Sequence, residues 1–205
     1  MDQHQFMALE ALNEQIRACP DCDLSRTRTH AVPGEGRPDA EIVFIGEAPG
    51  YYEDQQARPF VGPAGQFLDQ LLASIGMGRE DVYICNVIKC RPPDNRDPLP
   101  GEIKACHKWL HQQLEVISPK VVVTLGRYSL AKYFPGDSIS KVHGKERRVG
   151  NVVVVPMYHP AAALHQGALR RVIEADFQKL PVILEKARRE SERAAVPAAE
   201  QGRLF

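Results

Sequence analysis

The stretch EIVFIGEAPGYYEDQQARPFVGPAGQFLD, residues 41–69, decides the fold. It opens with a short apolar run, residues 41–46, whose lack of polar alternation is typical of a buried strand in a parallel sheet. Its last residues begin a segment, residues 64–76, that carries apolar side chains at helical spacing and ends at Gly76, a helix stop signal. Between them the chain gathers carboxylates, aromatic rings, prolines and glycines. Such residues directly after a strand predict a ligand site at the carboxyl edge of a sheet.

The rest of the chain repeats this alternation of short strands and helices. Short Val- and Ile-rich strands separated by helices indicate a parallel sheet covered on both faces. We therefore expect an α/β fold, a three-layer α/β/α sandwich with a central, mainly parallel four-stranded sheet. The expected strands are 41–46, 82–87, 121–125 and 152–155, the helices 4–17, 64–76, 102–117, a short one ending at Phe134 and a long one over 168–190, and the loops or hairpins 20–40, 91–101 and 139–150. The segments expected around one mouth are Glu47–Phe60, Asn86–Arg96, Gly126–Arg127 and His159–Leu164.

Length and composition fit one domain in residues 1–190, followed by a mobile tail in residues 191–205. The chain has 205 residues, 43% of them hydrophobic and 25% charged, which is ordinary for a globular protein. Its start lacks the apolar core of a signal peptide, and no apolar run is long enough to cross a bilayer. We expect a cytoplasmic monomer. The 26 basic and 26 acidic residues balance, which argues against bulk attraction to nucleic acid but allows a local basic face.

Four of the five cysteines form two spaced pairs. Cys19 and Cys22 make a C-x2-C motif, and fifteen residues separate Cys90 from Cys106. Four thiolates in two pairs suit a tetrahedral metal ion or an iron–sulfur cluster, and the spacing does not separate zinc from iron. The alternative is four buried thiols that act as small hydrophobic residues. Cys85 lies inside an apolar run and is expected in the core.

Several motifs around the predicted mouth resemble those of one family. They are GEAPGYYED (46–54), RPFVGPAGQFLD (58–69), NVIKCRPPDNRDP (86–98) and HPAAAL (159–164). With the four cysteines they make the chain resemble the family 4 uracil-DNA glycosylases, the iron–sulfur branch of their superfamily, over residues 19–177. The resemblance implies a monofunctional hydrolase that flips uracil out of DNA and cuts its N-glycosidic bond, initiating base-excision repair. It also implies a 4Fe–4S cluster on Cys19, Cys22, Cys90 and Cys106.

The resemblance assigns three residues to the extruded base. Phe60 would stack on uracil, although an aromatic residue here is otherwise a core side chain. Asn86 would read the base, because its amide can donate to O4 and accept from N3–H, whereas cytosine presents the reverse pattern; the alternative is an Asn that caps a strand end. His159 would face O2 and stabilise the anionic leaving group. All three are candidates for uracil binding, and Asn86 and His159 also for catalysis.

Glu47 is the carboxylate that the resemblance implicates in catalysis. It could orient or activate water, stabilise a cationic sugar, or act mainly through electrostatics or by binding uracil. The best-known branch of the superfamily has an aspartate where this chain has Ala48, so the role in activating water does not transfer directly. The Ala48 backbone N–H and Pro49 are further candidate contacts to uracil. Glu53 and Asn95 are expected to support these residues, although a solvated turn would also explain Glu53.

DNA contacts are expected around the same mouth. Leu164 is a candidate wedge for the minor groove, or else an ordinary apolar helix position. A basic loop before the fourth strand would face phosphates. A related branch traps uracil covalently through a histidine in an inserted loop; His143 lies in a different loop, so we expect turnover. The basic candidates are Lys141, His143, Lys145, Arg147 and Arg148, with Lys89, Arg91 and Arg96 adding charge nearby.

The last five residues carry a separate motif. Gln201, Leu204 and Phe205 fit the Q-x-x-L-F pattern of peptides that bind bacterial sliding clamps, although three fixed residues also occur in random tails. Two other functions stay open at this point. One is a non-catalytic iron–sulfur module that recognises uracil in DNA, and the other is a nucleotide-binding Rossmann-like protein. The chain lacks G-x-G-x-x-G and G-x4-G-K-[ST], which counts against the second.

Overall fold

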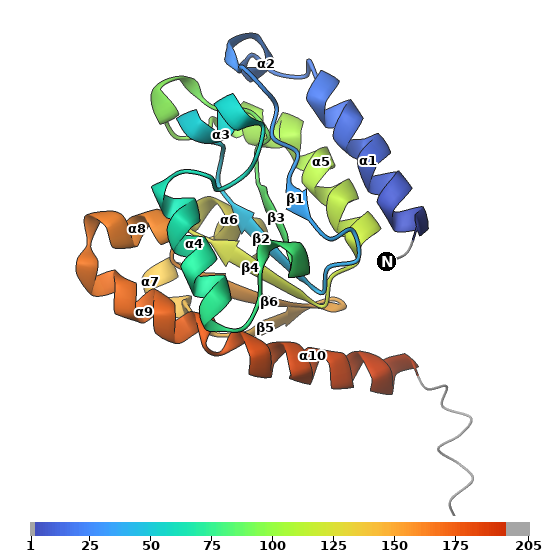
Figure 1. Cartoon of the computed structure of the whole chain (residues 1–205), viewed down its shortest axis with the longest axis vertical. Helices are drawn as coiled ribbons and strands as arrows, with labels where there is room; N and C mark the ends of the chain where they lie inside the picture. The colour runs from blue at the N-terminus through green and yellow to red at the C-terminus, as the bar shows by residue number, and fades with distance from the viewer. Residues whose placement is uncertain (1–2, 196–205) are drawn as a thin grey trace, which may run out of the picture.

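The sheet at the centre of the molecule has six strands in the order β1-β3-β2-β4-β6-β5. The computed structural model describes residues 3–195 (Figure 1). The middle four strands are parallel and correspond to the predicted ones, whereas both edge strands run antiparallel to their neighbours. The strands are β1 (Glu35–Gly36), β2 (Ile42–Gly46), β3 (Tyr83–Asn86), β4 (Val121–Leu125), β5 (Arg147–Val149) and β6 (Val152–Met157).

The predicted number of four strands is therefore wrong, because both edge strands were missed. β1 has two residues and β5 has three, and every residue of β5 is exposed. Strands this short and exposed carry no apolar run, so the sequence has no signal for them. The expected hairpin or loop at 139–150 contains β5, which forms a hairpin with β6, and the expected loop at 20–40 contains β1.

Alternate residues of each central strand point into two separate cores, as a sheet buried on both faces requires. Ile42 and Phe44 pack with α4, α9 and α10. Val43 and Ile45 pack with α1 and α5 on the opposite face. This arrangement confirms the three-layer α/β/α sandwich. The helices are α1 (Gln3–Ala18), α2 (Leu24–Thr27), α3 (Tyr51–Gln56), α4 (Pro63–Ser74), α5 (Pro100–Ile117), α6 (Arg127–Tyr133), α7 (Ile139–Val142), α8 (Pro160–His165), α9 (Gly167–Phe177) and α10 (Leu180–Ala195), with 3-10 turns η1 (Arg79–Asp81) and η2 (Pro93–Asn95).

The expected final helix over 168–190 is two helices, α9 and α10. Pro181 lies in the first turn of α10, where its missing N–H costs nothing, but it could not continue α9. α10 runs to Ala195, so residues 191–195, which were assigned to the tail, are helical. The clamp motif at Gln201, Leu204 and Phe205 lies outside the described residues. No helix within residues 3–195 is both long and apolar enough to span a membrane.

Candidate active site at the carboxyl edge of the sheet

A cavity of about 1090 Å³ opens where the loops after β2, β3, β4 and β6 meet. Parallel strands bring their carboxyl ends to one edge, and their pairing places Gly46 of β2 beside Asn86 of β3. The fold therefore brings together residues that lie more than a hundred positions apart. The predicted uracil-binding and supporting residues that line this cavity are Glu47, Ala48, Pro49, Glu53, Phe60, Asn86, Asn95 and His159.

Asn86 lies at the buried end of β3 with its side-chain oxygen unused. Its side chain is 1% exposed, and Oδ1 has no hydrogen-bond partner among the described residues. A buried acceptor without a partner costs free energy, so this amide is set up for a donor that enters the cavity. Gly46 makes room for it, because a Cβ there would lie 2.3 Å from Asn86 Oδ1 and 2.7 Å from Phe60 Cζ.

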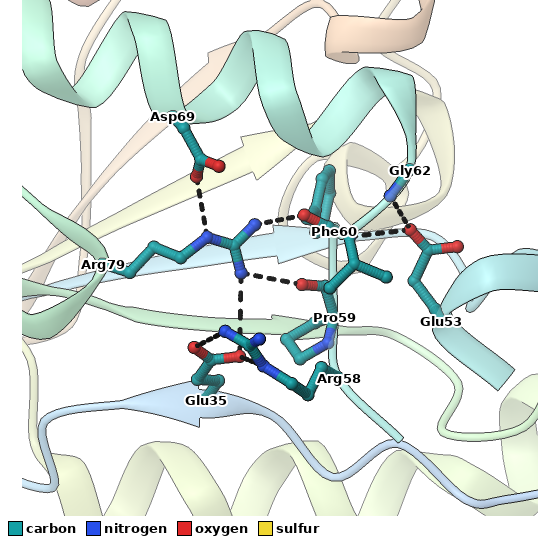
Figure 2. Close-up of polar contacts among 9 residues, drawn as sticks. Glu35, Glu53, Arg58, Pro59, Phe60, Gly62, Asp69 and Arg79 are labelled. Carbon is teal, nitrogen blue, oxygen red and sulfur yellow. Dashed lines mark hydrogen bonds and ion pairs between the residues drawn. The ribbon is translucent and has the colours of Figure 1, made fainter. Parts of the chain in front are cut away.

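Phe60 is held in a backbone conformation that non-glycine residues rarely adopt. Its φ is +53°, in the left-handed region, so surrounding contacts must enforce it. Glu53 holds the chain after Phe60: its Oε1 accepts from the N–H groups of Val61 and Gly62, both at 2.9 Å (the Gly62 contact is labelled in Figure 2). Its Oε2 accepts from Gly50 N–H at 3.1 Å. Glu53 therefore ties the start of α3 to the Phe60 loop.

Arg79 of η1 holds the same loop from the other side. Its guanidinium donates to the carbonyl oxygens of Pro59, at 2.9 Å, and of Phe60 (Figure 2). Asp69 of α4 accepts from Arg79 Nε at 2.7 Å, and Glu35 of β1 pairs with Arg79 at 3.7 Å. Sequence reasoning missed Arg79, because its backbone targets lie 19 and 20 positions away and no local pattern records that contact.

His159 is set up as a neutral hydrogen-bond donor. Its Nδ1 accepts from the backbone N–H of Ala161 at 3.1 Å, which places the ring proton on Nε2. Burial lowers the pKa of His159 to about 4, against a smaller raising effect of the Glu53 carboxylate. The ring stacks against Phe60 with centroids 5.4 Å apart. A neutral imidazole that donates from Nε2 at the cavity wall matches the predicted contact to a leaving oxygen.

Glu47 is half-buried in the cavity wall. Burial raises its pKa, the nearby Asp97 carboxylate raises it further, and the Arg127 guanidinium lowers it. Asp97 and Arg127 pair with each other and also line the cavity. The sequence placed Arg127 at the mouth without a role and gave none to Asp97. Asn95 accepts from Arg91 Nε at 2.7 Å, so its amide is fixed at the cavity rim. Ala48 supplies no carboxylate.

The predicted DNA-contacting residues fall into two groups. Leu164 is 50% exposed on α8, which borders the cavity, as a wedge would require. The basic loop lies elsewhere: Lys141, Lys145, Arg147 and Arg148 do not line the cavity. Arg147 pairs with Asp137 and Arg148 with Glu190, while His143 pairs with Asp176.

The expectation that Lys89 adds charge at the mouth is wrong. Its side chain is 1% exposed, so it cannot reach a phosphate. Arg91 instead stacks over the exposed ring of Tyr51, 5.2 Å from its centroid, and Arg96 binds the buried carboxylate of Glu102. The arginines that line the cavity, among the described residues, are Arg96 and Arg127.

The four predicted ligand cysteines line one small cavity between α1, α2, α5 and the segment after β3. Three of their sulfur atoms accept N–H bonds: Cys90 from Arg28 at 3.0 Å, Cys106 from the Lys89 backbone at 3.3 Å and Cys19 from Trp109 at 3.2 Å. Donors aimed at sulfur stabilise thiolates. The donor set therefore fits a thiolate-bound group, and Cys85 lies in the core as expected.

The same cysteines do not form a compact site for one ion. Within residues 3–195, no three cysteine, histidine or carboxylate side chains are grouped closely enough to hold a single metal ion. Burial raises the pKa of Cys106 to about 12 and also raises that of Cys90. These two thiols would therefore be neutral when free, and a bound cationic group would be needed to hold them as thiolates.

An aromatic platform, a buried amide with a free acceptor and a neutral imidazole donor lie around one cavity at the carboxyl edge of an α/β sheet. Residues 33–180 match the Uracil DNA glycosylase superfamily. The chain belongs to this superfamily and to its type-4 branch.

Curated relatives extend this likeness over most of the chain. A Type-4 uracil-DNA glycosylase of Sulfurisphaera tokodaii is 48% identical over 183 residues, covering 84% of this chain and 83% of the relative. One of Archaeoglobus fulgidus is 49% identical over 182 residues, covering 84% and 92%. One of Thermotoga maritima is 44% identical over 183 residues, covering 87% and 95%.

Proposed function

We propose that this protein is a monofunctional uracil-DNA glycosylase that flips uracil out of DNA, hydrolyses its N-glycosidic bond and leaves an abasic site. This reaction would start base-excision repair. The relatives named Type-4 uracil-DNA glycosylase support the activity. The observation that carries the proposal is the free Oδ1 of Asn86, buried in a cavity that Phe60 and His159 also line.

Asn86 supplies selectivity in this proposal. Its Oδ1 accepts from uracil N3–H, and its Nδ2 donates to uracil O4. Cytosine has an acceptor at N3 and a donor at N4, so each contact would be repulsive. The amide lies inside the protein, where an unmet hydrogen bond costs about 1–3 kcal/mol. Phe60 stacks on the base, and the Ala48 backbone and Pro49 complete the wall.

His159 and Glu47 supply the chemistry. Cleavage builds negative charge on the uracil and positive charge on the sugar. His159 donates from Nε2 to uracil O2 and stabilises the leaving anion without transferring a proton. Glu47 places a carboxylate near the cationic sugar and orients the attacking water. Water is the nucleophile, so the enzyme needs no lysine and cuts no strand.

Cys19, Cys22, Cys90 and Cys106 hold a 4Fe–4S cluster in this proposal. The shared cavity and the N–H donors to three of the sulfur atoms support it. The cluster supplies a structural crosslink that joins the end of α1 to α5 and to the segment after β3. Zinc is the competing occupant. Iron and sulfide analysis of anaerobically purified protein separates the two, and zinc without iron would contradict the cluster.

Uracil-containing DNA is the substrate, with Leu164 inserted into the minor groove and Lys145, Arg147 and Arg148 near the flanking phosphates. We also propose that the protein works in the cytoplasm as a monomer and that Gln201, Leu204 and Phe205 bind a sliding clamp. A pull-down of clamp by the full chain and by a chain lacking residues 201–205 tests the last point. Equal capture by both would remove it.

The activity is tested with an oligonucleotide that carries a single uracil. Free uracil should appear in chromatography, and the strand should break at the abasic site only after alkali treatment. A strand lacking uracil serves as the control. Absence of uracil release would contradict the activity, and strand breaks before alkali treatment would contradict a monofunctional enzyme.

A further inference from the structure

Lys89 is a fully buried lysine between the two sites of the molecule. Its side chain is 1% exposed. Nζ donates to the backbone carbonyl oxygen of Asn86 at 2.9 Å and to Gln113 Oε1 at 2.6 Å. The first contact attaches the lysine to the residue that reads the base. The lysine therefore helps to fix the backbone position of Asn86 at the end of β3.

The backbone of Lys89 contacts the cysteine cavity. Its backbone N–H donates to Cys106 Sγ at 3.3 Å, and the next residue in the chain is Cys90. Lys89 also lines the cavity that the four cysteines share. One residue thus joins the predicted cluster ligands to the base-reading amide through hydrogen bonds at both ends.

The charge of this lysine has no carboxylate partner. Both acceptors of Nζ are neutral oxygens, and among the residues that the structure describes no carboxylate pairs with it. A buried cation is costly unless an anion lies close by. Four cysteine thiolates around an iron–sulfur core would carry net negative charge next to it.

Gln113 fixes the lysine in this position. It is fully buried, and its Nε2 donates to Pro33 O at 2.9 Å and to Tyr83 OH at 3.1 Å. These contacts orient the amide so that Oε1 faces Lys89. The Cys85 side chain is a further hydrogen-bonding neighbour of Lys89, and burial raises the pKa of its thiol, so it supplies no negative charge. Loss of the negative charge in the cysteine cavity would therefore be relieved by moving Lys89 and, with it, the Asn86 backbone.

We propose that Lys89 is a positioning residue that couples the cysteine-held cluster to Asn86, so that an intact cluster is needed for tight uracil binding. This inference rests on the proposed function, since it assumes both the cluster and the uracil pocket. It gives the cluster a role in recognition, although the cluster lies outside the pocket. The cluster acts by balancing the buried ammonium group that anchors the Asn86 carbonyl.

The test measures free uracil binding by calorimetry, before and after anaerobic removal of iron with a chelator. The parent should lose about tenfold in affinity on iron removal, since a hydrogen bond to a charged group is lost. Lys89→Met should show this loss while still loaded with iron and should change less than twofold when iron is removed. Lys120→Met removes a lysine that pairs with Glu41 and should behave as the parent.

A second variant, which adds a negative charge beside Lys89, tests the proposal if Lys89→Met does not fold. Gln113→Glu places a carboxylate beside Lys89, so its melting temperature should fall less on iron removal than that of the parent. Equal losses in Gln113→Glu and the parent, or parent-like uracil affinity in iron-loaded Lys89→Met, would overturn the coupling. These results are distinguishable from failure of the proposed function, in which the parent itself lacks iron or releases no uracil.

Discussion

Replacing Gly46 with alanine tests whether Asn86 and Phe60 form one fitted pocket. The added methyl carbon would lie 2.3 Å from Asn86 Oδ1 and 2.7 Å from Phe60 Cζ, where ordinary contacts begin at 3.4 Å. The Gly46 backbone does not have positive φ, so alanine fits the strand itself and the conflict falls on these two side chains. Each must move by about 1 Å, a displacement that can cost about a hundredfold in rate.

The assay is kcat/KM for uracil release from a defined oligonucleotide. Gly46→Ala should lower it about a hundredfold, while overpacking should destabilise the fold by about 1–3 kcal/mol. Melting curves fix an assay temperature at which the variant is folded. Gly101→Ala is the matched control, because a Cβ there meets nothing within 4 Å. Folded Gly46→Ala with kcat/KM within about threefold of the parent would refute the close approach of Gly46, Asn86 and Phe60.

Four further predictions concern the pocket and the cysteine cavity. His159→Ala should lower kcat about 10²–10³-fold with little change in DNA affinity, and a parent-like rate would exclude the leaving-group contact. The folded-state pKa of His159 is about 4 and the ordinary value is 6.5, so on acidification the unfolded chain binds a proton before the folded protein does. The contribution of His159 to stability should therefore fall as the pH drops from 6.5 to 4 and stay constant above pH 6.5. Melting curves of the parent and of His159→Ala across this pH range measure it. Arg79→Gln should raise KM more than it lowers kcat, since it loosens the Phe60 platform. Arg58→Gln is the control, because Arg58 pairs with the same Glu35 but donates to neither the Pro59 nor the Phe60 carbonyl. Equal kinetics in both variants would argue against a role of Arg79 in holding the Phe60 loop. Purified protein should be brown and absorb at about 400 nm, because iron bound to cysteine absorbs there. Mutation of Cys90 to serine should remove the colour.

Residue patterns predicted the centre of the fold but not its edges. The four parallel strands carry the continuous Val- and Ile-rich runs that a doubly covered sheet requires, so these apolar runs located them. β1 and β5 pair with one neighbouring strand each, and such pairing leaves no mark in a two- or three-residue segment. The break between α9 and α10 had a local signal, Pro181, that the predicted single helix overlooked.

The pocket was predictable where motifs carried it and unpredictable where only the fold did. Glu47, Phe60, Asn86 and His159 follow strand ends in recognisable motifs, and all of them line the cavity. Lys89 was misread because a lysine beside arginines suggests a surface charge, and only the tertiary structure shows that it is buried.

Positioning residues are the hardest part to predict. Glu53 was found because it lies within a motif, whereas Arg79 acts on the backbone of a distant loop. Contacts between a side chain and backbone carbonyls depend on where the loop passes, not on which residues it contains. Asp97 and Arg127 likewise acquire a role only when their loops meet beside Glu47.

The most direct test of the central claim compares uracil with cytosine in the same oligonucleotide context, for the parent and for Asn86→Ala. The measured quantity is the ratio of kcat/KM for the two bases. The parent should release uracil and no detectable cytosine, and Asn86→Ala should lose at least about a hundredfold in uracil kcat/KM, since both amide hydrogen bonds disappear. A folded Asn86→Ala that keeps the parent rate and selectivity would contradict the assignment of Asn86 as the reader of the base.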